Sequence, residues 1–186
     1  MEKKDLLKDV IKHIDIKSYN STELVDAMRN MSFTSRDTAR AADILMMMCK
    51  EKECTNILTL AGSTSAAGCM QVYVDMVRNK MIDVVVATGA SIIDMDLFEA
   101  LGFKHYIGEK ENVIPDTTLR DLYIDRIYDT YIDEEELQAC DHTTFEIANM
   151  LEARPYSSRE FIYEIGKWLH EGNAVKKDSL IQTCYE

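Results

Sequence analysis

The sequence has little proline and glycine, no long apolar run and no internal repeat. Its 186 residues include only 2 prolines and 7 glycines, which excludes a long flexible linker or a low-complexity tail. No apolar run reaches the roughly 18 residues that a membrane-spanning helix requires. The N-terminus opens with alternating charges, Met1-Glu2-Lys3-Lys4-Asp5, unlike a secretory signal. The length and the apolar share of 46% therefore predict a soluble globular chain.

Paired cysteines and an excess of basic residues are also lacking. The 5 cysteines are odd in number, scattered and never spaced as C-x-x-C, so we expect a reduced cytosol and a cytoplasmic protein. The net charge of -12 argues against nucleic acid as a partner, because phosphate binding needs clustered lysine and arginine. The acidity leaves open a cationic small substrate or merely good solubility.

The first third of the sequence predicts helices. Leu6, Leu7, Val10, Ile11 and Ile14 recur at helical spacing and predict an amphipathic helix over residues 1–17. A short helix is expected over 23–30, and together these form an N-terminal helical extension, residues 1–34. A longer helix after Ser35 opens the α/β domain of residues 35–186. Its inner stripe, and its three consecutive methionines, are predicted to be core residues: Ala41, Ile44, Leu45, Met46, Met47 and Met48.

Two apolar runs then predict parallel strands buried on both faces, over 56–61 and 82–87. The stretch between them has the apolar spacing and length of a crossover helix. The pattern is that of an α/β fold, a parallel sheet flanked by helices. A last helix from about Lys177 has no strand after it, so the sheet is expected to be truncated.

The rest of the chain is predicted to be mostly helical. Helices are expected over 93–101, over 134–151 with a restart at Asp141, and from Ser157, where Ser157 and Glu160 have capping-box spacing. A short strand is expected over 105–107. The polar and aromatic segment 109–131 has weak periodicity and is predicted to be an ordered excursion over a partner or a site.

The turn from Gly62 to Gly68 is the first candidate site. It joins a buried strand to a helix start, where backbone N–H groups are unpaired and the helix dipole favours anions. Its residues are small, and its three hydroxyl groups can donate hydrogen bonds to a phosphate. It is neither G-x-G-x-x-G nor a P-loop. The residues fit a nucleotide-binding turn or a tight turn capped by serine.

Thr88, Gly89, Ala90 and Ser91 form a second small-residue turn after the next strand. Parallel neighbours bring their carboxyl ends together, and ligands in open α/β sheets bind outside those ends. Two such turns side by side favour a dinucleotide. Asp94 could hold a ribose hydroxyl or a cationic group, whereas Glu99 is predicted to belong to a solvated acidic helix start.

Other catalytic signals are weak. His13 and His170 are predicted to be surface residues of helices, His142 to be at a helix start, and His105 is open to either interpretation. No histidine or cysteine pair has metal-ligand spacing, and no G-x-S-x-G elbow occurs. No metal site is predicted.

Several linked segments resemble deoxyhypusine synthase and its deoxyhypusine-synthase-like relatives. The resemblance covers most of the chain from about Ser32. The segments that carry it are Gly62-Ser63-Thr64-Ser65-Ala66-Ala67-Gly68, the run from Val77 to Ala90, Asp96-Leu97-Phe98-Glu99-Ala100-Leu101-Gly102, His105-Tyr106-Ile107-Gly108, Arg126-Ile127-Tyr128-Asp129-Thr130-Tyr131, and Ser157 to Gly172.

The resemblance implies a Rossmann-like NAD-binding transferase, usually a tetramer. Such enzymes oxidise spermidine with NAD and transfer its aminobutyl group to a lysine of the hypusine-bearing translation factor or to a small amine. By position, the resemblance places NAD contacts at two turns and at one acidic residue. These are Gly62, Ser63, Thr64, Ser65 and Ala66, then Thr88, Gly89 and Ala90, and Asp94 as counterpart of a glutamate pair.

The resemblance also implies that the catalytic lysine lies in a C-terminal half that this sequence lacks. Lys176 and Lys177 do not have its motif context. Two hypotheses follow. The chain is the N-terminal portion of a transferase, as a fragment or a split-gene product, or it is a non-catalytic paralogue that binds and regulates an active subunit. The expected assembly is a homo-oligomer or a hetero-oligomer with a complementary subunit. A generic α/β binding domain is the third alternative.

Overall fold

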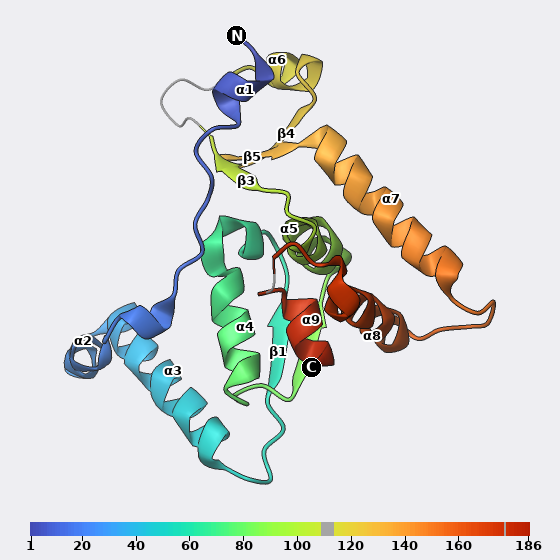
Figure 1. Cartoon of the computed structure of the whole chain (residues 1–186). Helices are drawn as coiled ribbons and strands as arrows, with labels where there is room; N and C mark the ends of the chain where they lie inside the picture. The colour runs from blue at the N-terminus through green and yellow to red at the C-terminus, as the bar shows by residue number, and fades with distance from the viewer. Residues whose placement is uncertain (109–113, 177) are drawn as a thin grey trace.

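The computed structural model describes residues 1–108, 114–176 and 178–186 (Figure 1). The first half of the chain contains, in order, α1 (Lys3–Leu6), η1 (Ile16–Ser18), α2 (Thr22–Met28), α3 (Phe33–Lys50), β1 (Ile57–Leu60), η2 (Ser65–Cys69), α4 (Met70–Arg78), β2 (Val84–Ala87), η3 (Ala90–Leu97) and α5 (Phe98–Ala100). The second half contains β3 (His105–Ile107), α6 (Asp116–Asp121), β4 (Ile124–Ile127), β5 (Thr130–Asp133), α7 (Glu134–Met150), α8 (Ser158–Trp168), η4 (Leu169–Asn173) and α9 (Leu180–Tyr185). The predicted α/β class is confirmed.

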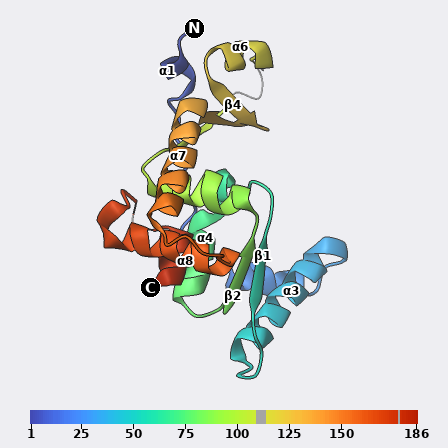
Figure 2. The same ribbon diagram turned by 90° about the vertical axis from the view of Figure 1, so that its right-hand side faces the viewer.

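Strands β1 and β2 form a parallel pair joined by α4, as the sequence predicts. Leu58 pairs with Val85 and Leu60 with Ala87, and these four side chains pack toward α4. Figure 2 shows α4 on one side of the two strands. Successive side chains of a strand point to opposite faces, so Ile57, Val84 and Val86 point away from α4. All three are exposed. The expectation of strands buried on both faces is therefore wrong for the described chain.

A second sheet holds β3, β5 and β4 in that order, all antiparallel. Strand β4 and the start of β5 lie inside the segment 109–131, which the sequence predicts to be an ordered excursion and of which residues 109–113 lie outside the described residues. Sequence periodicity misses the two strands because each is only four residues long and β4, Ile-Asp-Arg-Ile, does not alternate apolar and polar residues.

The predicted helix over residues 1–17 is wrong beyond Leu6. After α1 the chain runs extended along β3, where Ile11 N donates to the His105 carbonyl oxygen over 2.9 Å. Val10 forms an antiparallel bridge with Tyr106. The strand edge satisfies the backbone groups that a helix would have paired internally, so tertiary contacts override the helical pattern. We call residues 7–15 the N-terminal strap.

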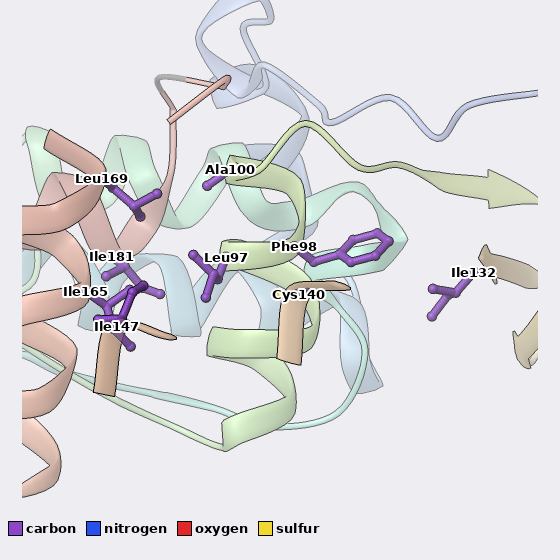
Figure 3. Close-up of a cluster of buried hydrophobic side chains, with 9 residues drawn as sticks. All are labelled: Leu97, Phe98, Ala100, Ile132, Cys140, Ile147, Ile165, Leu169 and Ile181. Carbon is purple, nitrogen blue, oxygen red and sulfur yellow. The ribbon is translucent and has the colours of Figure 1, made fainter. Parts of the chain in front are cut away.

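The largest core cluster joins η3 and α5 to α7, α8, η4 and α9 (Figure 3). Leu97, Phe98 and Cys140 are completely buried in it. Helix α7 is unbroken, so the predicted restart at Asp141 is wrong. The predicted capping box of Ser157 and Glu160 is confirmed at the start of α8. The cluster fixes the helical stretch that follows β2.

Helix α3 forms at the predicted place but contributes little to the core. Ala39 is its one buried residue in the described chain. Met46 and Met47 are 54% and 69% exposed, so their prediction as core residues is wrong. In Figure 1, α2 and α3 project from the body of the molecule at the lower left. The final helix begins at Leu180 rather than near Lys177, which lies outside the described residues.

Candidate functional site

The two predicted turns lie beside each other at the carboxyl ends of β1 and β2. The Ser91 hydroxyl donates a hydrogen bond of 3.3 Å to the Gly62 carbonyl oxygen. Thr88 N donates to the Leu60 carbonyl oxygen over 3.2 Å. Ser91 is buried, and its hydroxyl lies 3.2 Å from the Thr88 hydroxyl. The turns therefore form one continuous polar edge, as expected for neighbouring parallel strands.

Glycine keeps the backbone of both turns accessible. A Cβ added at Gly62 or Gly89 would meet no heavy atom within 4 Å. Gly62 also has a φ of +71°, in the left-handed region that side chains disfavour. A ligand can consequently approach the peptide groups here more closely than a side chain would permit.

A cavity of about 270 Å³ lies between the turns and the second sheet. Gly62, Ser63, Ala90 and Asp94 line it from the turns, and Asp125 lines it from β4. Its volume falls below the roughly 300–1,000 Å³ of sites for whole small molecules. This cavity by itself thus offers room for part of a dinucleotide.

The other predicted site residues are placed differently. Ser65 and Ala66 are buried, and Ala66 packs in the core beside Met70. The Thr64 hydroxyl accepts a hydrogen bond of 2.8 Å from Tyr73, and Thr88 and Gly89 are exposed beside the cavity. Within the described residues the buried Ser65 hydroxyl has no hydrogen-bond partner. Ser65 and Ala66 are both only 1% exposed, so neither their side chains nor their backbone groups are open to a ligand in this conformation.

Two carboxyl groups on opposite walls of the cavity have raised pKa values. Burial, with the nearby Asp141 charge, raises the pKa of Asp94. A hydrogen bond with Glu134 and burial raise the pKa of Asp125 to about 6. Asp125 can therefore exchange a proton close to neutral pH. The sequence missed Asp125 because its strand was not predicted.

Glu99 is not solvated, which corrects the sequence prediction. Its side chain is 9% exposed and contacts His13, His105 and Lys176. The distances are 2.6 Å from Oε2 to His13 Nε2, 2.9 Å from Oε1 to His105 Nδ1 and 2.6 Å from Oε2 to Lys176 Nζ. Burial alone would raise the pKa of Glu99, but hydrogen bonds from His105, His13 and Lys176 outweigh it and hold the pKa well below its usual range.

His13 is also not the surface residue that the helical pattern predicts, because its side chain is only 14% exposed. His105, which the sequence leaves open, is completely buried. His170 is exposed on a helix, as predicted. His142 is exposed too, but it lies within the unbroken α7 rather than at the predicted helix start. The sequence holds no local signal for the Glu99 cluster, whose members are brought together from four separate segments.

Asp96, one helical turn before Glu99, has a purely structural place. Its carboxylate accepts hydrogen bonds of 2.8 Å from the Ser179 hydroxyl, Leu180 N and Ile181 N. It therefore caps α9 and has no accessible oxygen for a ligand. The predicted absence of a metal site stays a prediction, although the described residues contain no cluster of three or more potential metal ligands.

The residues present fit the approach of a dinucleotide. Small side chains, open glycines and a helix start at Ala90 suit a phosphate, and Asp94 at the cavity wall suits a hydroxyl or an amine. The structure thus defines a class of protein: an α/β protein with a candidate ligand site at the carboxyl ends of two parallel strands.

The comparisons with known proteins assign the family. A family model described as deoxyhypusine synthase matches residues 23–186. The chain is 66% identical to the "Deoxyhypusine synthase-like protein" of Caulobacter vibrioides over 185 residues, which is 100% of this chain and 50% of that protein. It is 36% identical to "Probable deoxyhypusine synthase 2" of Methanosarcina acetivorans, over 92% of this chain and 49% of that protein. The chain belongs to the deoxyhypusine synthase family.

The chain spans about half the length of the curated relatives it matches. A solved structure from Entamoeba histolytica, assigned as a deoxyhypusine synthase, has a TM-score of 0.54 and 19% identity to this chain. The match covers 94% of this chain and 60% of the solved chain, and it supports the fold described above. In the described part of the chain, no helix has both the length and the apolar character needed to cross a membrane.

Proposed function

We propose that this chain carries the cofactor-binding half of a deoxyhypusine-synthase-like, NAD-dependent transferase. The reaction would move the aminobutyl group of spermidine to an amine acceptor, either a lysine of the hypusine-bearing translation factor or a small polyamine. Family membership supports the transferase class. NAD, spermidine, the acceptor and a cytoplasmic location are proposals. The catalytic lysine would come from a segment outside this chain.

The observation that carries the proposal is the contact between the two turns. Ser91 ties the second turn to Gly62 of the first, and the cavity opens beside both. When bound, NAD would supply the hydride acceptor. Gly62, Ser63 and the Thr88–Ala90 turn would admit its phosphates, and Asp94 would accept a hydrogen bond from a ribose hydroxyl or from an amine.

The small cavity supports an oligomeric or two-part site. About 270 Å³ holds part of a dinucleotide, so a second polypeptide segment or subunit would complete the enclosure. The exposed apolar face of β1 and β2, with Ile57 and Val86 more than half exposed, is a surface on which such a segment could pack.

A blocked cavity tests the proposal. The chain is co-expressed with the C-terminal half of the Caulobacter relative, and NAD should raise the melting temperature of the complex. At roughly 100 times its dissociation constant, NAD should add about 2.7 kcal/mol to the free energy of unfolding. Ala90→Trp, which fills the cavity from an exposed position, should abolish the shift. Ala148→Trp, on an exposed face of α7, should preserve it. No shift in the unmodified complex would contradict NAD binding.

A regulatory paralogue remains the second candidate, and the exposed apolar strand face favours it. This chain would then bind an active deoxyhypusine synthase subunit and change its turnover. Co-expression with the full-length Caulobacter relative distinguishes the two functions. A regulator should co-purify with that relative and alter its rate, whereas a transferase half should restore activity to the separate C-terminal half.

A further inference from the structure

Three segments meet at the Glu99 carboxylate, and one of them continues to the first candidate turn. His13 belongs to the N-terminal strap, His105 begins β3, and Lys176 precedes α9. The carboxylate is an acceptor only, so each partner donates to it. His105 is held in addition by Phe98, whose ring centre is 5.0 Å away. The cluster is therefore an ordered junction.

The strap leads from this junction directly to Gly68, the last residue of the first turn. Ile14 N, one residue after His13, donates a hydrogen bond of 2.9 Å to the Gly68 carbonyl oxygen. A Cβ at Gly68 would lie 2.9 Å from the Lys12 carbonyl oxygen, so the strap and the turn are in close backbone contact. Gly68 has a φ of +96°, which a residue with a side chain would strain to adopt.

The turn also has backbone hydrogen bonds of its own. Ala67 N donates to the Ser63 carbonyl oxygen and Cys69 N donates to the Thr64 carbonyl oxygen. The strap adds a contact from outside the turn at the residue where the helical geometry breaks. Fixing this residue fixes the direction in which the turn leaves β1.

We propose that Glu99 is a positioning residue for the first candidate cofactor turn, acting through His13 and the strap on Gly68. The inference rests on the proposed function in naming NAD as the ligand that the turn receives. Glu99 itself does not line the cavity. Its role is to keep the turn in one conformation before the ligand arrives, which reduces the ordering that binding must otherwise supply.

The partners of Glu99 provide an internal comparison. His13 connects the carboxylate to the turn, whereas Lys176 connects the same oxygen to the chain before α9. If Glu99 acts through the strap, loss of His13 should loosen the turn and loss of Lys176 should not. A general loss of packing would affect both variants alike.

The test is amide hydrogen exchange without ligand, read at Ile14, Ala67 and Cys69, followed by NAD titration of the same proteins with the C-terminal half added. His13→Ala should speed exchange at these amides by about tenfold, the size expected for one lost hydrogen bond to a charged group, and raise the dissociation constant for NAD similarly. His13→Gln, which retains an N–H donor, should restore both. Lys176→Met and His142→Ala should leave both at the wild-type values.

The outcomes separate the two proposals. Unchanged exchange in His13→Ala, or equal loosening in Lys176→Met, overturns the positioning role while NAD binding by the wild type leaves the proposed function intact. If His13→Ala speeds exchange but the wild type does not bind NAD, the positioning role is supported and the assignment of NAD as the ligand is rejected. If His13→Ala fails to fold, Ile14→Pro removes the amide that donates to Gly68, and exchange at Ala67 and Cys69 must then show the same loosening, or the role is rejected.

Discussion

The helical stretch from Ala90 to Ala100 has two ends with opposite properties. At its start, Ala90 and Asp94 border a cavity, and Gly89 faces open space. At its other end, Asp96 and Glu99 are buried and all their carboxylate oxygens are engaged with other segments. One end leaves polar groups available for a ligand, whereas the other uses them to hold the fold.

The difference shows why two aspartates only two positions apart, Asp94 and Asp96, have different surroundings. Asp94 is partly exposed, so its carboxylate has space for an outside partner. Asp96 is fully buried, and a buried carboxylate is tolerated only where donors surround it. Function is thus expected at the start of the stretch and stability at its end.

The largest effect should come from removing the carboxylate that caps α9. Asp96→Ala leaves Leu180 N, Ile181 N and the Ser179 hydroxyl buried without their acceptor, and we expect a loss of roughly 3–5 kcal/mol in the free energy of unfolding. Urea denaturation measures it. Asp37→Ala, at an exposed position of α3, should change stability by less than about 0.5 kcal/mol. A small change in the free energy of unfolding of Asp96→Ala would contradict the structural role proposed for this end of the stretch.

Neutralising Glu99 should cost less and should depend on pH. Its hydrogen bonds to charged or polar partners predict a loss of about 2–3 kcal/mol near pH 7 in Glu99→Gln. Because the folded-state pKa lies below the unfolded value of about 4.3, this contribution is complete above that pH and is lost as pH falls through the folded pKa.

Urea midpoints between pH 3 and pH 7, in steps of about one unit across the range in which carboxylates titrate, provide the measurement. The difference in urea midpoint between the wild type and Glu99→Gln should become smaller only at the acidic end of this pH range. Glu146→Gln, which removes an exposed glutamate paired with His142, serves as the matched control and should track the wild type throughout. A difference that grows on acidification would contradict the low folded-state pKa.

Gly68→Ala tests the contact between the first turn and the N-terminal strap. The added Cβ would lie 2.9 Å from the Lys12 carbonyl oxygen and would occupy a left-handed backbone, so a loss of about 2 kcal/mol is expected. Gly62→Ala carries the backbone strain without the clash and should lose only about 1 kcal/mol. Thermal unfolding of both variants measures the contribution of the strap, and equal losses would show that the strap contact has no effect.

The smallest effect on stability is expected at the open end. Asp94→Asn should change the free energy of unfolding by less than about 0.5 kcal/mol, since no hydrogen bond within the described residues depends on its carboxylate. It should nevertheless weaken NAD binding about tenfold in the complex with the C-terminal half, the effect of one hydrogen bond to a charged group. If Asp94→Asn lowered the stability without weakening NAD binding, Asp94 would be a structural residue and not a ligand-binding one.

The open end was predictable because its signals are local. A strand followed by small residues is visible in the order of the amino acids, and both turns, Gly62–Gly68 and Thr88–Ser91, form where the pattern predicts them. The crossover helix α4 and the capping box at Ser157 are equally local. The adjacency of the turns followed from the parallel arrangement of β1 and β2.

The closed end was not predictable. Glu99 reads as a solvated acid and His13 as a surface residue, because nothing near either in the sequence indicates the other. The apolar spacing from Leu6 to Ile14 suggests a helix, yet Val10 bridges to Tyr106 and the strap follows a strand edge. Asp125 was missed for the same reason, since β4 is stable only through its pairing with β5.

The sequence by itself determined the α/β class, the two small-residue turns and the family resemblance, because all three depend on the order of neighbouring residues. Only the tertiary structure decided which acids are available to a ligand. Burial and hydrogen bonding are set by segments far apart in the sequence, such as those of His13 and Glu99, which are 86 positions apart, and a local pattern does not indicate such contacts. The turn at Gly62 and its strap therefore join what the sequence predicts to what only folding creates.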